Sequence, residues 1–274
     1  MIGRFGWSAA FLAMWMLAAP VLAGPYEDAF TAYRAGNYQT ALSLLLPLAE
    51  QGNARAEALL GSMYDEGKGV PQDDSEALKW YQSSAQKGNA TGQYGLGVFL
   101  MDGRDVEQTD LPQATELFRK AALQGNAGAQ YRLGLIYSEA MGVAEDDVIA
   151  AEWFRKSASQ GVAEAQVRLA LMHMEGNGVP QDLVRAADWF SKAAIQGNTQ
   201  AQFSLGELYT EGKGVSRNLI QAYVWYSLVA AKEGDGKASE AGARRDAIEP
   251  EMTANQLREA KRRVREWRPP FRPN

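Results

Sequence analysis

The sequence of 274 residues contains no cysteine and a single histidine, His173. The absence of cysteine excludes disulfides, thiol catalysis and zinc–thiolate sites. One histidine cannot build a His-rich metal site, and a Ser-His-Asp triad would depend on His173 alone. Because 46% of the residues are apolar and 22% are charged, the composition is that of an ordinary folded protein. The sequence therefore predicts a folded chain with no metal site and no cofactor.

Basic residues are scarce relative to acidic ones in all but the last part of the chain. Residues 24–240 carry a net charge of −10, whereas residues 241–274 carry +4. An acidic body argues against nucleic acid as the main partner. The basic end is either a solvated last helix or a segment that contacts an acidic surface, and the sequence leaves both open.

Only one long apolar run is present, and it lies at the N-terminus. Arg4 precedes the apolar residues 9–23, which end in a small-residue cleavage pattern at Ala23. Residues 1–23 are therefore predicted to be a cleavable signal peptide. An uncleaved membrane anchor is the alternative, since residues 5–23 approach the length that spans a bilayer. Either way, the rest of the chain is expected to be periplasmic or secreted.

A glycine-rich stretch, EGKGVPQD at residues 66–73, raises the question of a phosphate-binding loop. Such a loop needs G-x-x-x-x-G-K-[ST], and here Lys68 is followed by glycine and valine. The stretch recurs as EGNGVPQD at residues 175–182 and as EGKGV at residues 211–215, with Asn177 in place of the lysine. All three copies keep Gly-x-Gly-Val but not the lysine. The motif therefore indicates a backbone conformation that needs glycine, and not a chemical role of the lysine.

The whole chain between these copies is repetitive. A Gln-Gly-Asn tripeptide or a close variant recurs every 36 or 37 residues, with its glycine at positions 52, 88, 125, 161 and 197 and a weaker copy at 234. A leucine followed by glycine or alanine keeps the same period, as does an aromatic pair that begins with Trp80 and is Leu117-Phe118 in the second copy. A fixed period of this length is typical of repeat architectures.

Each copy contains the pattern of two helices. In the third copy, residues 127–139 and 150–161 have apolar residues at helical spacing. The glycine of Gly-x-Gly-Val can end the first helix in a left-handed conformation. Asp73 or Asp74, and Asp182 in the later copy, can cap the second helix by accepting its free N–H groups.

The pattern A-x-A-Q-x-x-L-G-x-x-Y-x-x-G-x-G-V-x-x-D…W-[YF]-x-x-A-x-x-Q-G-N resembles the Sel-one-like repeat (SLR) family of the tetratricopeptide-like superfamily. Five repeats are expected over residues 54–235, at about 54–89, 90–126, 127–162, 163–198 and 199–235. The resemblance implies an all-α fold, a right-handed superhelical solenoid of antiparallel helix pairs (SLR/TPR-like). It also implies an adaptor role in protein assemblies. Asp105 and Ala140 stand where the family has glycine, so these two turns are expected to be irregular.

The two ends are expected to cap the solenoid, because terminal repeats need a polar outer face. Residues 24–53 resemble a tetratricopeptide hairpin, with Pro47 inside the second helix. Residues 236–267 are predicted to form two closing helices, with Thr253 as an N-cap. Residues 268–274 form a tail rich in proline and arginine.

The residues that could carry chemistry have simpler structural explanations. His173 occupies a position that is tyrosine in three other copies, so we interpret it as a packing residue. Paired acids such as Asp73-Asp74 recur at helix ends, where they cap. The periodic tryptophans and tyrosines are interpreted as core residues rather than as a sugar-binding platform.

Binding is expected to come from what varies along the solenoid, on the first helix of each pair, which lines the concave face in the family. Arg132 and Arg168 occupy the same position one repeat apart, and arginine and aromatic residues dominate interface hot spots. The candidate partner-binding residues are Tyr94, Tyr131, Arg132, Arg168, Phe203 and Glu207. An ordinary solvated helix surface is the open alternative for these positions.

The sequence favours a non-enzymatic adaptor or regulatory scaffold that binds a partner protein, such as an envelope sensor or an assembly component. No catalytic residue, metal or nucleic acid is expected. Two alternatives remain. One is a hydrolase of cell-wall or β-lactam amides, against which the absence of cysteine argues. The other is a module that binds peptidoglycan or another glycan.

Overall fold

The computed structural model of the protein describes residues 24–106, 108–232, 234 and 236–268. Within these residues the chain is entirely helical, with fourteen α-helices, one short 3-10 helix and no strand, which confirms the predicted all-α class. The helices are α1 Pro25–Arg34, α2 Tyr38–Glu50, α3 Ala54–Glu66, α4 Asp74–Gln86, α5 Ala90–Asp102, α6 Leu111–Leu123, α7 Ala127–Ser138, α8 Asp147–Ser159, α9 Ala163–Glu175, α10 Leu183–Ile195, α11 Thr199–Glu211, α12 Leu219–Ala230, α13 Ala238–Ile248, η1 Glu249–Glu251 and α14 Ala254–Glu266.

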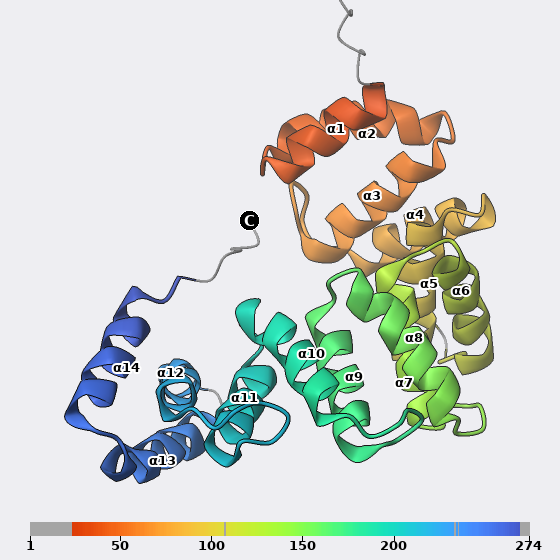
Figure 1. Ribbon diagram of the computed structural model, residues 1–274. Helices are drawn as coiled ribbons and strands as arrows, with labels where there is room; N and C mark the ends of the chain where they lie inside the picture. The colour runs from red at the N-terminus through yellow and green to blue at the C-terminus, as the bar shows by residue number, and fades with distance from the viewer. Residues whose placement is uncertain (1–23, 107, 233, 235, 269–274) are drawn as a thin grey trace, which may run out of the picture.

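The helices follow one another along a curved solenoid (Figure 1). Each helix from α1 to α12 packs on the next α-helix in the chain, and the main additional contacts join α3 to α5 and α12 to α14. Distant parts of the sequence therefore do not meet in one core. Each repeat is stabilised by its neighbours, as in other solenoids.

The Gly-x-Gly-Val turn has two separate tasks, which the turn between α9 and α10 illustrates. Gly176 ends α9 with φ 84°, and its N–H donates to the carbonyl of Met172 at 2.8 Å. Gly178 lies against the start of α8 in the preceding repeat, where an added Cβ would be only 2.1 Å from the carbonyl oxygen of Asp147. Asp182 then caps α10 by accepting a hydrogen bond from the N–H of Arg185 at 3.0 Å. The motif is a helix stop, a contact between repeats and a helix start.

The two departures from the glycine pattern are visible as strained backbone. Asp105 has φ 48° and Ala140 has φ 54°, and among the described residues they are the only non-glycine residues with positive φ. Both keep the left-handed conformation that a glycine would adopt freely. The irregularity expected at these two turns is therefore an energetic cost, because a residue with a Cβ is held in a left-handed backbone conformation.

The core between the two helices of a repeat is formed by an aromatic ring packed on a small residue. The ring of Phe154 in α8 covers Gly134 in α7 so closely that an added Cβ would lie 2.5 Å from it. Tyr81, Phe118 and Tyr226 cover glycines in the same way. The predicted leucine–glycine and aromatic positions are thus the two sides of one contact.

Buried polar side chains link the two helices of a repeat, and some of them also bind a backbone carbonyl of the preceding repeat. Gln166 is buried, its amide donates to the carbonyl of Ala158 at 3.1 Å, and its oxygen accepts from Gln196 at 2.9 Å. The same pairing joins Gln93 to Gln124 and Gln130 to Gln160. In the first repeat the two positions hold Glu57 and Lys87, so an ion pair replaces the two carboxamides.

Both ends of the described chain are helical, at the places where the sequence predicted helices. At the start, α1 packs on α2, with Pro47 inside α2. At the end, α13 and α14 both pack on α12, and Thr253 caps α14 in a capping box with Gln256. The expected signal peptide of residues 1–23 and the end of the tail, residues 269–274, lie outside the described residues. Among the residues that the structure describes, no helix is both long and apolar enough to cross a bilayer.

Candidate partner-binding surface

The six candidate residues all lie on the first helices of the repeats. We call the surface formed by α3, α5, α7, α9 and α11 the A face, and the surface formed by α4, α6, α8, α10 and α12 the B face. Tyr94 lies on α5, Tyr131 and Arg132 on α7, Arg168 on α9, and Phe203 and Glu207 on α11. Successive repeats stack, so these residues are spread along the solenoid and do not form one compact cluster.

The two arginines differ in their surroundings. Arg168 is exposed, and its guanidinium pairs with the carboxylate of Glu139 from the preceding repeat at 3.1 Å. Arg132 is half-buried and makes no hydrogen bond or ion pair with the described residues, whereas most of the surface arginines do. Arg132 therefore offers an unbalanced charge, whereas the charge of Arg168 is already partly compensated.

The three aromatic candidates take part in packing between helices. Tyr94 and Tyr131 are half-buried, and their rings lie 6.0 and 5.9 Å from those of Phe118 and Phe154. Each tyrosine therefore combines a packed face with an accessible edge. Phe203 is 3% exposed and packs edge-on against Tyr226 at 5.7 Å. Its side chain belongs to the core and has almost no surface that a partner could contact.

Glu207 lies in a hollow of about 400 Å³ between the fourth and fifth repeats. Burial raises the pKa of Glu207, while Arg244, 3.8 Å away, partly opposes the shift. The other residues that line the hollow are Met174, Gln181, Leu183, Ser204, Leu208, Glu211 and Lys213. The hollow thus combines apolar walls with two carboxylates and one ammonium group.

Sequence reasoning missed a second hollow, of about 280 Å³, at the first repeat. Its walls include Tyr26 and Phe30 from α1, whose rings stack 6.1 Å apart, and Phe30 is exposed. The guanidinium of Arg55 lies 4.0 Å from the ring centre of Tyr26 and pairs with Glu27 at 2.8 Å. The signal was available, because Tyr26 and Phe30 are four residues apart and must share one face of a helix.

The residues considered for catalysis have structural roles. His173 is buried, and its Nδ1 lies 3.3 Å from the carbonyl oxygen of Pro180 in the adjoining turn. Asp73 and Asp182 cap helices, as the sequence indicated. Across the described part of the chain, no group of three His, Cys, Asp or Glu side chains is arranged to hold a metal ion.

Comparison with known proteins agrees with this architecture. The family model described as Sel1 repeat matches residues 54–89, 90–126, 127–162, 163–198 and 199–234. A Sel1 repeat protein from Oxalobacter formigenes is 30% identical and superposes with a TM-score of 0.71, covering 88% of this chain and 99% of that one. The protective antigen c5321 of uropathogenic Escherichia coli, which displays an SLR fold, is 28% identical with a TM-score of 0.57, covering 88% of this chain and 60% of that one.

A relative of known role matches only part of this chain. The exopolysaccharide production negative regulator of Rhizobium leguminosarum bv. viciae is 36% identical over 80 residues, which are 28% of this chain and 30% of that protein. The alignment thus spans less than a third of the regulator. Because the family model covers most of the chain in five consecutive copies, the protein belongs to the Sel1 repeat family.

Proposed function

We propose that the protein is a non-enzymatic adaptor that binds a partner protein through the A face of its solenoid. Sel1 repeat scaffolds typically mediate protein–protein interactions. The observation that carries the proposal is the pair of accessible arginines at one position of the A face in two successive repeats. That position holds Leu59, Gly95, Arg132, Arg168 and Ser204 in the five repeats; Leu59, Gly95 and Ser204 are buried, whereas Arg132 is half-buried and Arg168 is exposed. Two accessible arginines in successive repeats suit a binding face, because arginine is enriched among interface hot spots.

Arg132 is the centre of the proposed contact. Its guanidinium has no carboxylate partner among the described residues, and the half-buried ring of Tyr131 adjoins it in the chain. A planar guanidinium binds a carboxylate with two parallel hydrogen bonds, and an adjacent aromatic edge adds apolar contact. The partner segment is therefore expected to carry an acidic residue at this place.

The proposed setting is the cell envelope or the exterior, on the basis of the signal-peptide pattern in residues 1–23. The similarity to the Rhizobium regulator supports a regulatory role, with an envelope sensor or an assembly component as the partner. Comparing the cellular fraction of the full chain with that of a variant lacking residues 2–23 tests the location. Equal amounts of both forms in the cytoplasm would contradict it.

The binding proposal is tested with immobilised protein and an extract of the cell envelope. The double variant Arg132→Ala/Arg168→Ala removes two charges from the A face. Arg34→Ala/Arg155→Ala removes two exposed arginines that make no ion pair with described residues and lie off the A face, on α1 and α8. A protein retained by the wild type and by the control but lost with the A-face variant supports the proposal.

Two other outcomes would overturn the proposal. Equal capture of the same proteins by all three forms would exclude the arginines from binding. Retention of soluble peptidoglycan, or hydrolysis of a chromogenic β-lactam, without any captured protein would favour the glycan-binding or hydrolase alternatives. Circular dichroism should show the same helical content in all variants, because the substituted side chains are not part of the core.

A further inference from the structure

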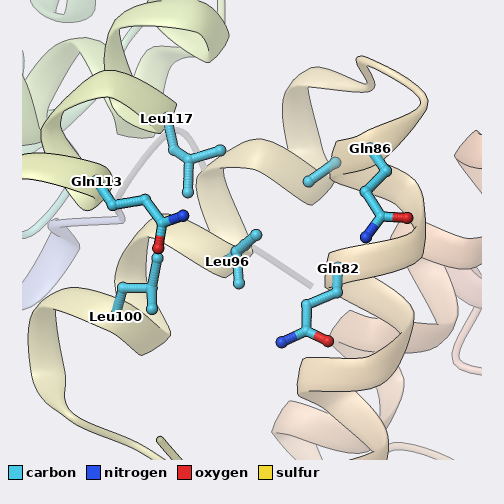
Figure 2. Close-up of a pocket in the computed structure, with 7 residues that line it drawn as sticks. Gln82, Gln86, Leu96, Leu100, Gln113 and Leu117 are labelled. Carbon is cyan, nitrogen blue, oxygen red and sulfur yellow. The ribbon is translucent and has the colours of Figure 1, made fainter. Parts of the chain in front are cut away.

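The second repeat contains a hollow of about 450 Å³ between its own second helix, α6, and the preceding one, α4. Figure 2 shows Gln82 and Gln86 on one wall, Gln113, Leu117 and Leu100 on the other, and Leu96 between them. Its volume lies within the range of about 300 to 1,000 Å³ that is usual for ligand pockets.

The other repeats show what normally occupies this place. Leu117 stands where the remaining repeats have Trp80, Trp153, Trp189 and Trp225. Two of these indoles show the pattern: Trp153 packs against the core cluster that contains Ala122 and Leu133, and Trp189 against the cluster that contains Ala158 and Leu169. Within this one chain, an indole between successive second helices is therefore the rule.

A second aromatic residue is also missing from the second repeat. Leu100 occupies the position of Tyr64, Tyr137, His173 and Tyr209 in the other four repeats. Two rings that the architecture accommodates elsewhere are thus both replaced by the smaller leucine at one site. This double replacement explains why the hollow lies here.

The neighbouring side chains did not close over the gap. Ala85 is 9% exposed, whereas its equivalents Ala122, Ala158 and Ala194 are 3%, 1% and 0% exposed. Leu96 is half-buried, although the equivalent leucines of the other repeats are 0% exposed. The apolar floor of the hollow is accessible where its counterparts are covered by the chain's own indole.

The lining has no charged side chain and three carboxamides. The side chains of Gln82, Gln86 and Gln113 make no hydrogen bond with the described residues, so each can donate to or accept from a ligand. An uncharged lining suits a neutral group and penalises a buried carboxylate or ammonium. An indole also carries an N–H, and in the repeats that hold Trp80 and Trp225 that N–H is buried without a partner among the described residues. The glutamine oxygens would satisfy it here.

We propose that this hollow on the B face is a docking socket for a tryptophan side chain of a partner protein. The indole occupies the place that the four other repeats fill from their own sequence, and the glutamine carboxamides bind its N–H and the adjoining peptide groups. This socket lies on the B face and is independent of the A-face contact of the proposed function.

The first test measures binding of two probes to the purified protein by saturation-transfer difference NMR. The probes are N-acetyl-L-tryptophanamide and the capped peptide Gly-Gly-Trp-Gly-Gly. Ligands of this size in an apolar pocket are expected to bind with a Kd of about 0.1 to 1 mM. The peptide should bind at least as tightly as the amide, and N-acetyl-L-leucinamide at least about tenfold more weakly.

The decisive variant is Leu117→Trp, which restores the residue of the other repeats and fills the socket from within. It should abolish probe binding and raise Tm by covering the exposed floor. Leu123→Trp is the matched control, because Leu123 lies on the same helix, is 73% exposed and does not line the hollow. The control should bind the probes like the wild type. Leu100→Tyr gives a second, independent occlusion if Leu117→Trp fails to fold.

Several results would overturn the proposal. They are no binding of either probe by the wild type, equal binding by Leu117→Trp and Leu100→Tyr, or equal binding of the leucine amide. Binding of the free amide but not of the peptide would assign the hollow to a small molecule. Dimerisation of the wild type that Leu117→Trp abolishes, measured by sedimentation, would make a second copy of this chain the occupant.

Discussion

The buried ion pair of the first repeat gives a sharp prediction about stability. Glu57 is 2% exposed, and its Oε1 accepts hydrogen bonds from the ammonium of Lys87 and from the hydroxyl of Ser83 at 2.9 Å. Its Oε2 is buried without a partner among the described residues. Replacing Lys87 by alanine would leave a buried carboxylate with a single neutral donor.

The expected magnitude follows from the burial of the two partners. Removing one partner of a fully buried pair costs about 3 to 5 kcal/mol. The Lys87 side chain is 40% exposed, so water reaches that end of the pair and reduces the loss. We therefore expect Lys87→Ala to destabilise by about 2 kcal/mol, which is within the range for a charged hydrogen bond.

The neighbouring repeats supply the compensating substitution. Glu57→Gln/Lys87→Gln installs the two carboxamides that pair as Gln93–Gln124 and Gln130–Gln160. Neutral groups of similar shape carry a much smaller desolvation cost than ions. The double variant should therefore lie within about 1 kcal/mol of the wild type, or be more stable.

The assay must resolve individual repeats, because a solenoid need not unfold in one step. Urea unfolding followed by circular dichroism gives the global change, and hydrogen exchange gives protection in α3 and α4 relative to α9 and α10. Lys79→Ala is the control, since Lys79 is exposed and pairs with Glu76 within one helix. A loss in Lys87→Ala no larger than in Lys79→Ala would refute the reasoning. A double variant as unstable as Lys87→Ala would do the same.

Three further predictions concern the turns and one acidic residue. Ala140→Gly should stabilise by about 0.5 to 1 kcal/mol in urea unfolding, because relief of the left-handed conformation exceeds the entropy cost of glycine. Gly178→Ala should destabilise by at least about 2 kcal/mol in the same assay, since its Cβ would meet the carbonyl of Asp147; an unchanged midpoint would refute the close contact. The pKa of Glu207 is raised in the folded protein, so folding favours the protonated carboxyl group. The stability that this protonation contributes is present below the unfolded pKa and is lost as the pH rises through the folded pKa. Glu207→Gln should therefore gain stability relative to the wild type near pH 7, and thermal unfolding should show that the gain shrinks as the pH falls towards 4.

Much of the fold could be predicted because the same sequence pattern recurs in each repeat. The helix of the third repeat predicted over residues 127–139 is α7, Ala127–Ser138, and Thr253 caps α14 as expected. The second helix of that repeat was predicted to begin at residue 150 but begins at Asp147. Its first turn contains an aspartate and two β-branched residues, which make a weak helical pattern. The cap by Asp146 decides the start, because it accepts a hydrogen bond from the N–H of Ile149.

The candidate surface was less predictable, because helical spacing places a residue on a face without saying how much the neighbouring repeat covers. Phe203 and Arg132 lie one helical position apart in the repeat pattern, yet Phe203 is buried in the cluster that α12 forms with α13 and α14, whereas Arg132 is half-buried. The pKa of Glu207 depends on burial by a neighbouring element, which composition does not reveal. The partner-binding role of the six candidate residues stays a prediction.

Departures from the repeat pattern differ in physical meaning, and the structure separates them. Where Ala140 replaces glycine, the backbone keeps its path and the cost is local strain. Where Glu57 and Lys87 replace two glutamines, the pair changes together and the link between the two helices of the repeat is kept. Where Leu117 replaces tryptophan, no described residue fills the space, and the floor of the hollow stays exposed. A substitution that is compensated within the chain needs no partner to explain it. An uncompensated substitution leaves apolar surface that a bound partner can cover. Leu117→Trp is therefore the most informative single change.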